Sequence, residues 1–453
     1  MTSARRSGYY TGGFLALYSI CLLLLLPRLS LWLDEILDMI GVRFYDLPRL
    51  IEYVTTNSGG VPLGYLVQAA SVHVLGYSAF SGRLPSAFFS VLGAIGILLI
   101  AKKFALRWPL LPCAIFCLFP LQFRYALEAR PYSQALAIAI WMTLALLWLR
   151  EEPTWRRSLL YCACIASGLY TQPYSAFVAI AHFIWIVWLP PDEMKKKLLP
   201  AAGGALFLAA LAFLPWYSYA RRFWRESIET SHFHSTLNVK TPLLILHELI
   251  GAGYPGAILL LIGVCIGLVM KFRSRPDRLF WILQLACPVL LALLADQVFG
   301  YFVAIRQMIF LLAPLAILFA AGVEALIERR PRLAVLATCL FAFILIYGDI
   351  HLFTAPREDW AAAANLLASH TRQGRCVIFL PADSARLYSF FNPEASSQAC
   401  PPDLAGLQTV IAAVSPYGSI AAQKELQFRL SRLGFHRQIL SNNLVRVELY
   451  QSP

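Results

Sequence analysis

The chain has 453 residues, of which 59% are hydrophobic and only 14% charged, and its formal net charge is +13. A mean hydropathy of +0.63 excludes an ordinary soluble domain and indicates a polytopic membrane protein. Uninterrupted apolar runs favour helices over alternating barrel strands, and basic clusters between those runs indicate membrane topology rather than a nucleic-acid platform.

Eleven apolar segments are predicted to cross the membrane as helices. In chain order they are 12–29, 84–100, 109–119, 133–149, 158–170, 174–189, 199–217, 257–270, 279–294, 307–326 and 333–347. Basic clusters such as Lys102–Lys103 follow every second segment, which places the N-terminus in the cytoplasm by the positive-inside rule. Residues 40–60 are predicted to form an amphipathic surface helix, and residues 61–75 an interfacial (juxtamembrane) or re-entrant helix too short to span.

An odd number of spans places the C-terminal residues outside the cytoplasm, and their composition changes to that of a globular domain. Helices at 359–369 and 420–433 and strands at 376–380, near 410 and at 444–450 predict a small α/β domain. Cys376 and Cys400 are its only cysteines and are candidates for a disulfide. The predicted domains are therefore a transmembrane domain at 1–348, with catalytic outer loops near 30–83 and 120–132, and a periplasmic domain at 349–453.

Carboxylates directly after the first span are the strongest signal for a functional site. A charged side chain costs about 2.5–3.5 kcal/mol at the centre of an inserted helix, so acids at a membrane boundary indicate function by default. Asp34 and Glu35 occupy such a boundary, and the parity of the spans brings Glu128 to the same face. The alternative is a solvated loop flank, and the functional interpretation is favoured.

Four arginines are predicted at the same membrane face, namely Arg83, Arg124, Arg130 and Arg306. Guanidinium forks bind phosphate oxygens in pairs, so this set suits a lipid phosphate presented from the bilayer. A carboxylate opposite it would take the proton of an attacking hydroxyl. The structural alternative for each arginine is snorkelling from a helix end.

No metal centre is indicated by the histidines and cysteines. His232 and His234 lie in a polar loop with no acidic residue closer than Glu229, whereas a metal site needs three or four converging ligands. Cys162 and Cys164 lack the spacing of a zinc site.

Six motifs in this chain, taken in order, resemble a known family. They are Trp-x-Asp-Glu (Trp32, Asp34, Glu35), Pro-Leu-x-Tyr (Pro62, Leu63, Tyr65), Arg-Leu-Pro-Ser (Arg83, Leu84, Pro85, Ser86), Tyr-Ala-x-Glu-Ala-Arg-x-Tyr (Tyr125, Ala126, Glu128, Ala129, Arg130, Tyr132), an Arg before Leu-Leu-Ala-Pro (Arg306, Leu311, Leu312, Ala313, Pro314) and Arg-x-Asp-Trp-x-x-Ala-Ala (Arg357, Asp359, Trp360, Ala363, Ala364). The chain resembles polyprenyl-phosphate-sugar-dependent membrane glycosyltransferases of the C-type (GT-C) fold. Within that fold it is similar to the bacterial branch of lipid A aminoarabinose transferases, core galacturonosyl transferases and protein O-mannosyltransferases.

The resemblance implies an all-α polytopic membrane protein of GT-C type with a small C-terminal α/β domain, and it implies a role for each site residue. Asp34 would be the catalytic base, with Glu35 beside it and Glu128 as the second acid. The donor phosphate would be bound by Arg130, Arg306, Arg124 and Arg83, and the substrate pocket would include Tyr65 and Tyr132. Some relatives use a divalent metal at the acidic pair and others do not, so a metal at Asp34 and Glu128 stays open.

Two positions depart from the family pattern. Gln172 stands where relatives often carry His, and Val61 stands where many carry His or Lys. The Val61 change removes one candidate phosphate ligand, which leaves an altered donor geometry and lost activity as alternatives.

The sequence thus predicts an inverting glycosyltransferase of the bacterial cytoplasmic membrane. Its expected partners are a polyprenyl-phosphate sugar donor, a glycan, lipid or protein acceptor and the surrounding membrane lipids, with no nucleic acid. The alternatives are a lipid or polysaccharide transporter, which the lack of repeated halves disfavours, and an assembly component without transferase activity.

Overall fold

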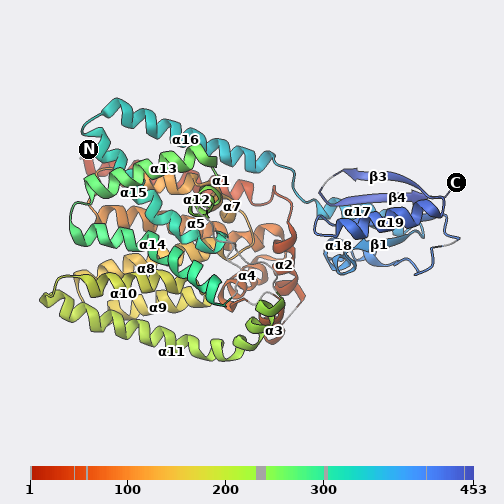
Figure 1. Ribbon diagram of the computed structural model, residues 1–453, viewed down its shortest axis with the longest axis horizontal. Coiled ribbons are helices and arrows are strands. Elements are labelled where there is room, and N and C mark those ends of the chain that lie inside the picture. The colour runs from red at the N-terminus through yellow and green to blue at the C-terminus, as the bar shows by residue number, and fades with distance from the viewer. Residues whose placement is uncertain are drawn as a thin grey trace. The chain divides into compact units, whose positions relative to one another are not determined.

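The computed structural model describes residues 3–44, 46–57, 60–230, 241–299, 305–404, 406–442 and 444–452. The chain forms two compact units, residues 1–27 with 45–353 and residues 28–44 with 354–453. The first unit is a bundle of helices and the second a small α/β fold (Figure 1). Residues 28–44 therefore belong to the same unit as the C-terminal part of the chain.

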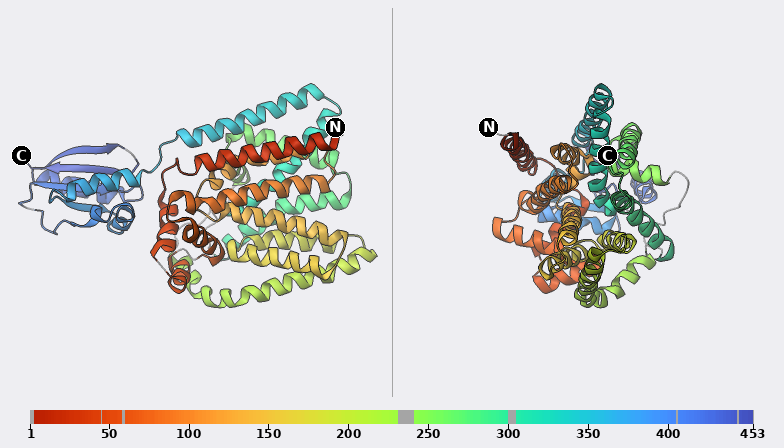
Figure 2. Two further views of the ribbon diagram at one scale, coloured as in Figure 1. Left: turned by 180° about the vertical axis from the view of Figure 1, so that it is seen from behind. Right: turned by 90° about the vertical axis from the view of Figure 1, so that its left-hand side faces the viewer.

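The long helices of the first unit lie side by side with their axes roughly aligned, whereas some of the shorter helices lie across them (Figures 1 and 2). Together these helices make up the first unit. They are α1 (Ser3–Leu25), α3 (Leu47–Asn57), α4 (Pro62–Leu75), α5 (Ala79–Lys103), α6 (Leu110–Leu118), α7 (Pro120–Ala126), α8 (Tyr132–Glu151), α9 (Trp155–Thr171), α10 (Ser175–Trp188), α11 (Glu193–Thr230), α12 (Thr241–Ile250), α13 (Gly253–Ile266), the π-helix η1 (Gly267–Lys271), α14 (Arg275–Phe299), the 3-10 helix η2 (Ile305–Leu311), α15 (Leu312–Ile327) and α16 (Pro331–Thr354). Every predicted span falls on one of these helices, so the helical membrane fold is confirmed.

Seven helical segments of the described chain are long and apolar enough to cross a membrane. They are α5, α8, α11, α13 with η1, α14, η2 with α15, and α16. Tyr9–Leu25, Pro62–Leu75 and Ser175–Trp188 are apolar helices below that length. The count of eleven spans therefore stays a prediction.

Helices α5 and α8 run beside each other in the same direction. Their backbones approach closely because glycine stands at the contact. A Cβ atom on Gly96 would lie 2.5 Å from Cγ2 of Ile140. The indole N–H of Trp141 donates to the carbonyl of Leu92 at 3.0 Å across the same contact. Near the N-terminal ends of the two helices, the hydroxyl of Ser86 donates to the carbonyl of Arg130 at 3.0 Å. This end of the helix pair carries most of the predicted site.

A second close contact joins α13 and η1 to α15. Gly263 and Gly267 form a G-x-x-x-G pattern, the signature of closely packed membrane helices. A Cβ on Gly267 would lie 2.2 Å from the carbonyl oxygen of Leu318, and one on Gly322 would lie 2.0 Å from that of Gly263. No side chain fits at these positions, so the two backbones are in direct contact.

The second unit contains α2 (Leu33–Phe44), α17 (Trp360–Thr371), α18 (Ala385–Phe391), α19 (Ile420–Arg432) and four strands. The strands are β1 (Cys376–Leu380), β2 (Thr409–Val414), β3 (His436–Asn442) and β4 (Arg446–Gln451), in the order β1-β2-β4-β3. β1 pairs with β2 in parallel, and the other two pairings are antiparallel. Cys376 and Cys400 form a disulfide with a Cα–Cα distance of 4.7 Å, as considered from the sequence.

The structure corrects two predicted elements. Residues 40–60 form parts of two helices, because Asp46 accepts a hydrogen bond from the backbone N–H of Arg49 at 3.1 Å and caps a new helix. The predicted loop from residue 221 is helical up to Thr230, where α11 ends. Strand β3 and helix α18 were not predicted. His232 and His234 lie outside the described residues.

Candidate functional site

The buried carboxylate of Glu128 lies in the turn between α7 and α8. Its Oε1 atom accepts a hydrogen bond from Nε of Arg124 at 2.7 Å. The two residues are four apart at the end of a short helix, a spacing that brings side chains together. The Glu128 side chain is 0% exposed and that of Arg124 is 35% exposed, so the guanidinium alone of the pair reaches the surface.

Tyr132, the first residue of α8, gathers the next two arginines. Its hydroxyl oxygen accepts a hydrogen bond from Nε of Arg306, which lies in η2, at 3.0 Å. The guanidinium of Arg130 lies 5.6 Å from the centre of the Tyr132 ring. The ring of Tyr125, on α7, has its centre 4.5 Å from the centre of the Tyr132 ring. The structure therefore brings together Arg124, Tyr125, Glu128, Arg130, Tyr132 and Arg306, which we call the arginine–tyrosine cluster.

The charge balance of this cluster favours an anionic ligand. Of the six residues of the cluster, three carry a guanidinium group and one, Glu128, carries a carboxylate. Burial raises the pKa of Tyr125 well above its ordinary value, so its phenol stays a neutral hydrogen-bond donor. Guanidinium and phenol donors together suit a phosphate group.

Helix α4 packs against the turn that carries this cluster. A Cβ on Gly64 would lie 2.6 Å from Cβ of Pro131, so only glycine permits α4 to approach the turn. The side-chain amide of Gln68 donates to the carbonyls of Gly82 and Ala129, each at 3.4 Å. Tyr65, predicted in the substrate pocket, is buried on the same helix with 6% exposure.

Arg83 has a different setting from the other three predicted arginines. It is fully buried on α5, and its Nη1 donates to the carbonyl oxygen of Leu26 at 2.9 Å. Leu26 follows the end of α1, whose last carbonyls lack partners inside the helix. This contact holds the end of α1 and favours a positioning role for Arg83.

Asp34 and Glu35 lie in the first turn of α2, in the second unit. Glu35 is 0% exposed, and its Oε2 accepts the backbone N–H of Trp32 at 3.4 Å, which is one half of a capping box. Asp34 is partly exposed. A helix N-terminus is a favourable position for a carboxylate because of the helix dipole, and Asp34 reaches the surface there.

Glu358 ties the start of α2 to the rest of the second unit. Its Oε2 accepts the backbone N–H of Leu33 at 3.0 Å and the indole N–H of Trp360 at 2.6 Å. Its other oxygen accepts the hydroxyl of Tyr417. Glu358 fixes the residue directly before Asp34, and it is the positioning residue for that carboxylate.

Sequence reasoning assigned no role to Gln68, Tyr125 or Glu358. Tyr125 and Glu358 both lie inside motifs that were noted, Glu358 at the variable position between Arg357 and Asp359. The acidic residue at that position, between Arg357 and Asp359, was the available signal. Gln68 gives no signal, because its two partners are backbone carbonyls distant in sequence.

Among the residues that the structure describes, no three His, Cys, Asp or Glu side chains gather as metal ligands. Glu128 is bonded to Arg124. A metal at Asp34 and Glu128 stays a prediction.

Residues 59–219 match the family model described as dolichyl-phosphate-mannose-protein mannosyltransferase. A search of curated proteins by sequence found no match. The chain is similar in structure to ArnT from Cupriavidus metallidurans bound to undecaprenyl phosphate, with a TM-score of 0.57, 12% identity and coverage of 97% of this chain and 98% of that one.

Two further solved structures share the architecture. The archaeal oligosaccharyltransferase AglB from Archaeoglobus fulgidus, in complex with an inhibitory peptide and a dolichol-phosphate, has a TM-score of 0.56 and 10% identity over 90% of this chain and 69% of that one. The arabinofuranosyltransferase AftD from Mycobacteria has a TM-score of 0.54 and 16% identity over 97% of this chain and 41% of that one. The resemblance to GT-C membrane glycosyltransferases is confirmed, and the chain has their multi-span fold.

Proposed function

We propose that this protein is an inverting glycosyltransferase that moves one sugar from a polyprenyl-phosphate carrier to a hydroxyl group of a glycan, lipid or protein. The reaction takes place on the outer face of a bacterial cytoplasmic membrane. The family match and the GT-C fold support the class of enzyme. The solved ArnT and AglB complexes with lipid phosphates support the class of donor.

The observation that carries the proposal is the arginine–tyrosine cluster. Arg124 is held by Glu128 and Arg306 by the Tyr132 hydroxyl, while Arg130 lies against the Tyr132 ring. Guanidinium groups fixed in this way lose less conformational entropy on binding than flexible side chains do. The phosphate of the donor lies between them, and its polyprenyl tail extends into the bilayer.

Asp34 removes the proton of the acceptor. It is the accessible carboxylate of the acidic pair at the start of α2, whereas Glu35 is committed to the backbone of its own helix. The assignment of Asp34 rests on its motif and on this accessibility.

The transfer is a single displacement. The acceptor O–H bond breaks, its proton passes to Asp34, and the oxygen forms a bond to the anomeric carbon of the sugar. The bond between that carbon and the phosphate oxygen breaks, and its electron pair leaves with the polyprenyl phosphate. One displacement inverts the anomeric configuration. The arginines stabilise the negative charge that grows on the phosphate, and this is the main electrostatic contribution to the rate.

Native mass spectrometry of the full-length protein, purified in mild detergent, tests the proposal. Asp34→Asn is expected to retain a polyprenyl-phosphate sugar, while the wild type carries free polyprenyl phosphate. Asp383→Asn is the matched control, because Asp383 is exposed in the same unit, and it is expected to resemble the wild type. Absence of polyprenyl phosphate from all three proteins, in membranes that contain it, would favour a transporter or an assembly component instead.

A further inference from the structure

A polar cavity lies at the opposite ends of α5 and α8 from the arginine–tyrosine cluster. Its volume is about 450 Å³, and it is lined by residues from α5, α8, α11, η1 and α14 and from the turn after α5. Arg150 is eighteen residues after Tyr132 on α8, which separates the two by about 27 Å along the helix axis. The cavity is therefore a second site of the first unit.

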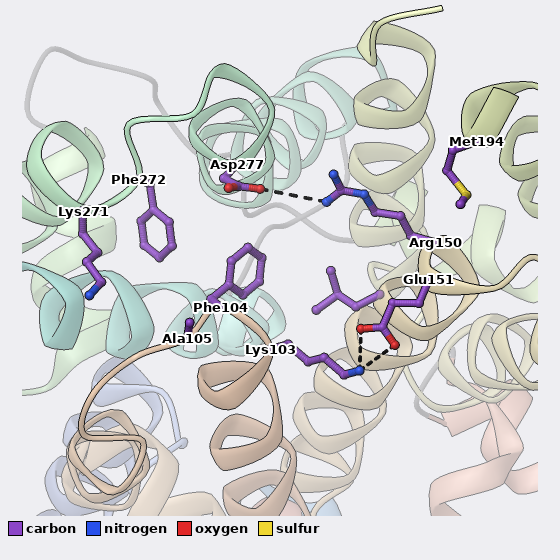
Figure 3. Close-up of a pocket in the computed structure, with 10 residues that line it drawn as sticks. Lys103, Phe104, Ala105, Arg150, Glu151, Met194, Lys271, Phe272 and Asp277 are labelled. Carbon is purple, nitrogen blue, oxygen red and sulfur yellow. Dashed lines mark hydrogen bonds and ion pairs between the residues drawn. The ribbon is translucent and has the colours of Figure 1, made fainter. Parts of the chain in front are cut away.

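Five charged side chains face this cavity, as Figure 3 shows. Lys103 at the end of α5 donates to both carboxylate oxygens of Glu151, at 2.5 and 2.6 Å. Arg150 lies on α8, and its Nη1 is 3.9 Å from the nearest oxygen of Asp277. Lys271 lies across the cavity, 3.1 Å from Oε2 of the buried Glu324. The cavity thus offers both cations and anions.

Arg150 retains hydrogen-bonding capacity toward the cavity. Its distance of 3.9 Å from Asp277 is too long for a hydrogen bond, and no hydrogen bond from its guanidinium to another described residue is found. The guanidinium lies 5.0 Å from the centre of the Trp185 ring, which holds its plane in place. Asp277 is itself fixed, because its Oδ2 accepts the hydroxyl of Ser274 at 2.6 Å. An oriented guanidinium with free donors is a phosphate-binding group.

Two irregular backbone segments shape the cavity wall. The π-helix η1 ends at Lys271, and the backbone N–H of Phe272 bonds to the carbonyl of Gly267 at 3.1 Å. Such single-turn π segments are frequent at functional sites. Ala105 has φ of +52°, a left-handed conformation in which a residue other than glycine is strained.

The chemistry of the remaining lining fits a lipid better than a soluble anion. Phe104, Leu147, Met194 and Phe272 supply apolar surface beside the charged groups. The cavity lies where membrane helices end, the depth at which phospholipid headgroups meet protein. The carboxylates of Glu151 and Asp277 suit a headgroup that carries an ammonium group as well as a phosphate.

We propose that this cavity binds the headgroup of a zwitterionic phospholipid, phosphatidylethanolamine, with its phosphate on Arg150 and Lys103 and its ammonium group near Glu151 and Asp277. The assignment is independent of the proposed transferase reaction. It concerns the membrane face opposite to the donor site.

Thermal unfolding of the delipidated full-length protein in non-ionic detergent tests this site, because a ligand that binds the native state raises Tm. Dioctanoyl phosphatidylethanolamine is expected to raise Tm more than dioctanoyl phosphatidylglycerol, and inorganic phosphate is expected to have little effect. Arg150→Gln is expected to weaken the apparent affinity for phosphatidylethanolamine at least tenfold. Arg156→Gln, which alters an exposed arginine of the same basic region outside the cavity, serves as the control and is expected to stay within twofold of the wild type.

Three results would overturn the proposal. Equal lipid affinity in wild type and Arg150→Gln would show that the pairs are structural ion pairs only. A loss in Arg156→Gln as large as in Arg150→Gln would show non-specific attraction to the basic surface. An equal Tm shift with inorganic phosphate would assign the cavity to a free phosphate. If Arg150→Gln is misfolded by size-exclusion chromatography, Lys103→Gln replaces it with the same expectations, because its partner Glu151 is half exposed.

Discussion

The two ends of the α5–α8 helix pair carry similar residues in different balance. The cluster around Tyr132 has three arginines for one buried carboxylate. The cavity around Arg150 has three cations and two carboxylates in its lining. Among these residues the first end has two more cations than carboxylates and the second end has one more. The number of neutralising acids, rather than the number of arginines, therefore distinguishes the ligands that the two ends suit.

The largest expected effect is at the Tyr132 end. Arg306→Ala removes a guanidinium fixed by the Tyr132 hydroxyl, and loss of such a charge-stabilising donor lowers kcat by about 100-fold. Transfer assays with a polyprenyl-phosphate sugar would measure this, with Arg156→Gln as the unaffected control. A loss of less than threefold would remove Arg306 from the phosphate site.

Gly322→Ala is expected to disturb the Arg150 end selectively. The added Cβ would lie 2.0 Å from the carbonyl oxygen of Gly263, and overpacking of this kind costs about 1–3 kcal/mol. Because α13 leads directly into η1, lipid-dependent stabilisation should fall together with Tm. Gly13→Ala has open space around its Cβ and should change neither quantity. An unchanged Tm in Gly322→Ala would contradict the direct backbone contact.

Gly64→Ala is expected to act at the Tyr132 end alone. The added Cβ would clash with the ring of Pro131, the residue directly before Tyr132. The displaced turn should lower kcat/KM about tenfold, or roughly 1.4 kcal/mol. Gly204→Ala on α11, with nothing within 4 Å of its Cβ, is the control. Retained transfer activity together with loss of lipid-dependent stabilisation would reverse the assignment of the two ends.

The smallest effect is expected at Ala105. Replacement by glycine relieves the left-handed conformation at φ of +52° and should raise the free energy of unfolding by about 0.5–1 kcal/mol. The midpoint of thermal unfolding would report it. A lower midpoint would mean that the Ala105 methyl group makes contacts worth more than the backbone strain.

Hydrophobic length and charge placement predicted the long apolar helices of the first unit, because a segment such as residues 84–100 is apolar throughout and ends at Lys102–Lys103. They did not predict the short helices α7 and α12. They could not predict α2. Residues 33–44 contain acids, an arginine and few sustained apolar positions, and they are stabilised by tertiary contacts instead. Arg43, for example, donates to the carbonyl of Phe390 at 3.0 Å.

The site was predictable where its residues are close in sequence. Arg124, Glu128 and Arg130 share one motif, so their proximity follows from a short helix and a turn. The roles of Arg83 and Glu35 were not separable from those of their neighbours, because whether a charged side chain faces substrate or a backbone group depends on burial. The bond between Arg306 and Tyr132 joins residues that lie 174 positions apart, and only the folded bundle reveals it.

The division of the second unit between two distant stretches of chain sets an order of events during synthesis. Residues 28–44 leave the ribosome early, yet the groups that fix them, Glu358 and the carbonyl of Phe390, are translated roughly 300 residues later. At about 5–20 residues per second this interval is roughly 15–60 s. Throughout it the nascent bundle is inserted while Asp34 lacks the fixed setting that Glu358 provides, so the proposed base is completed only when the last part of the chain has been made.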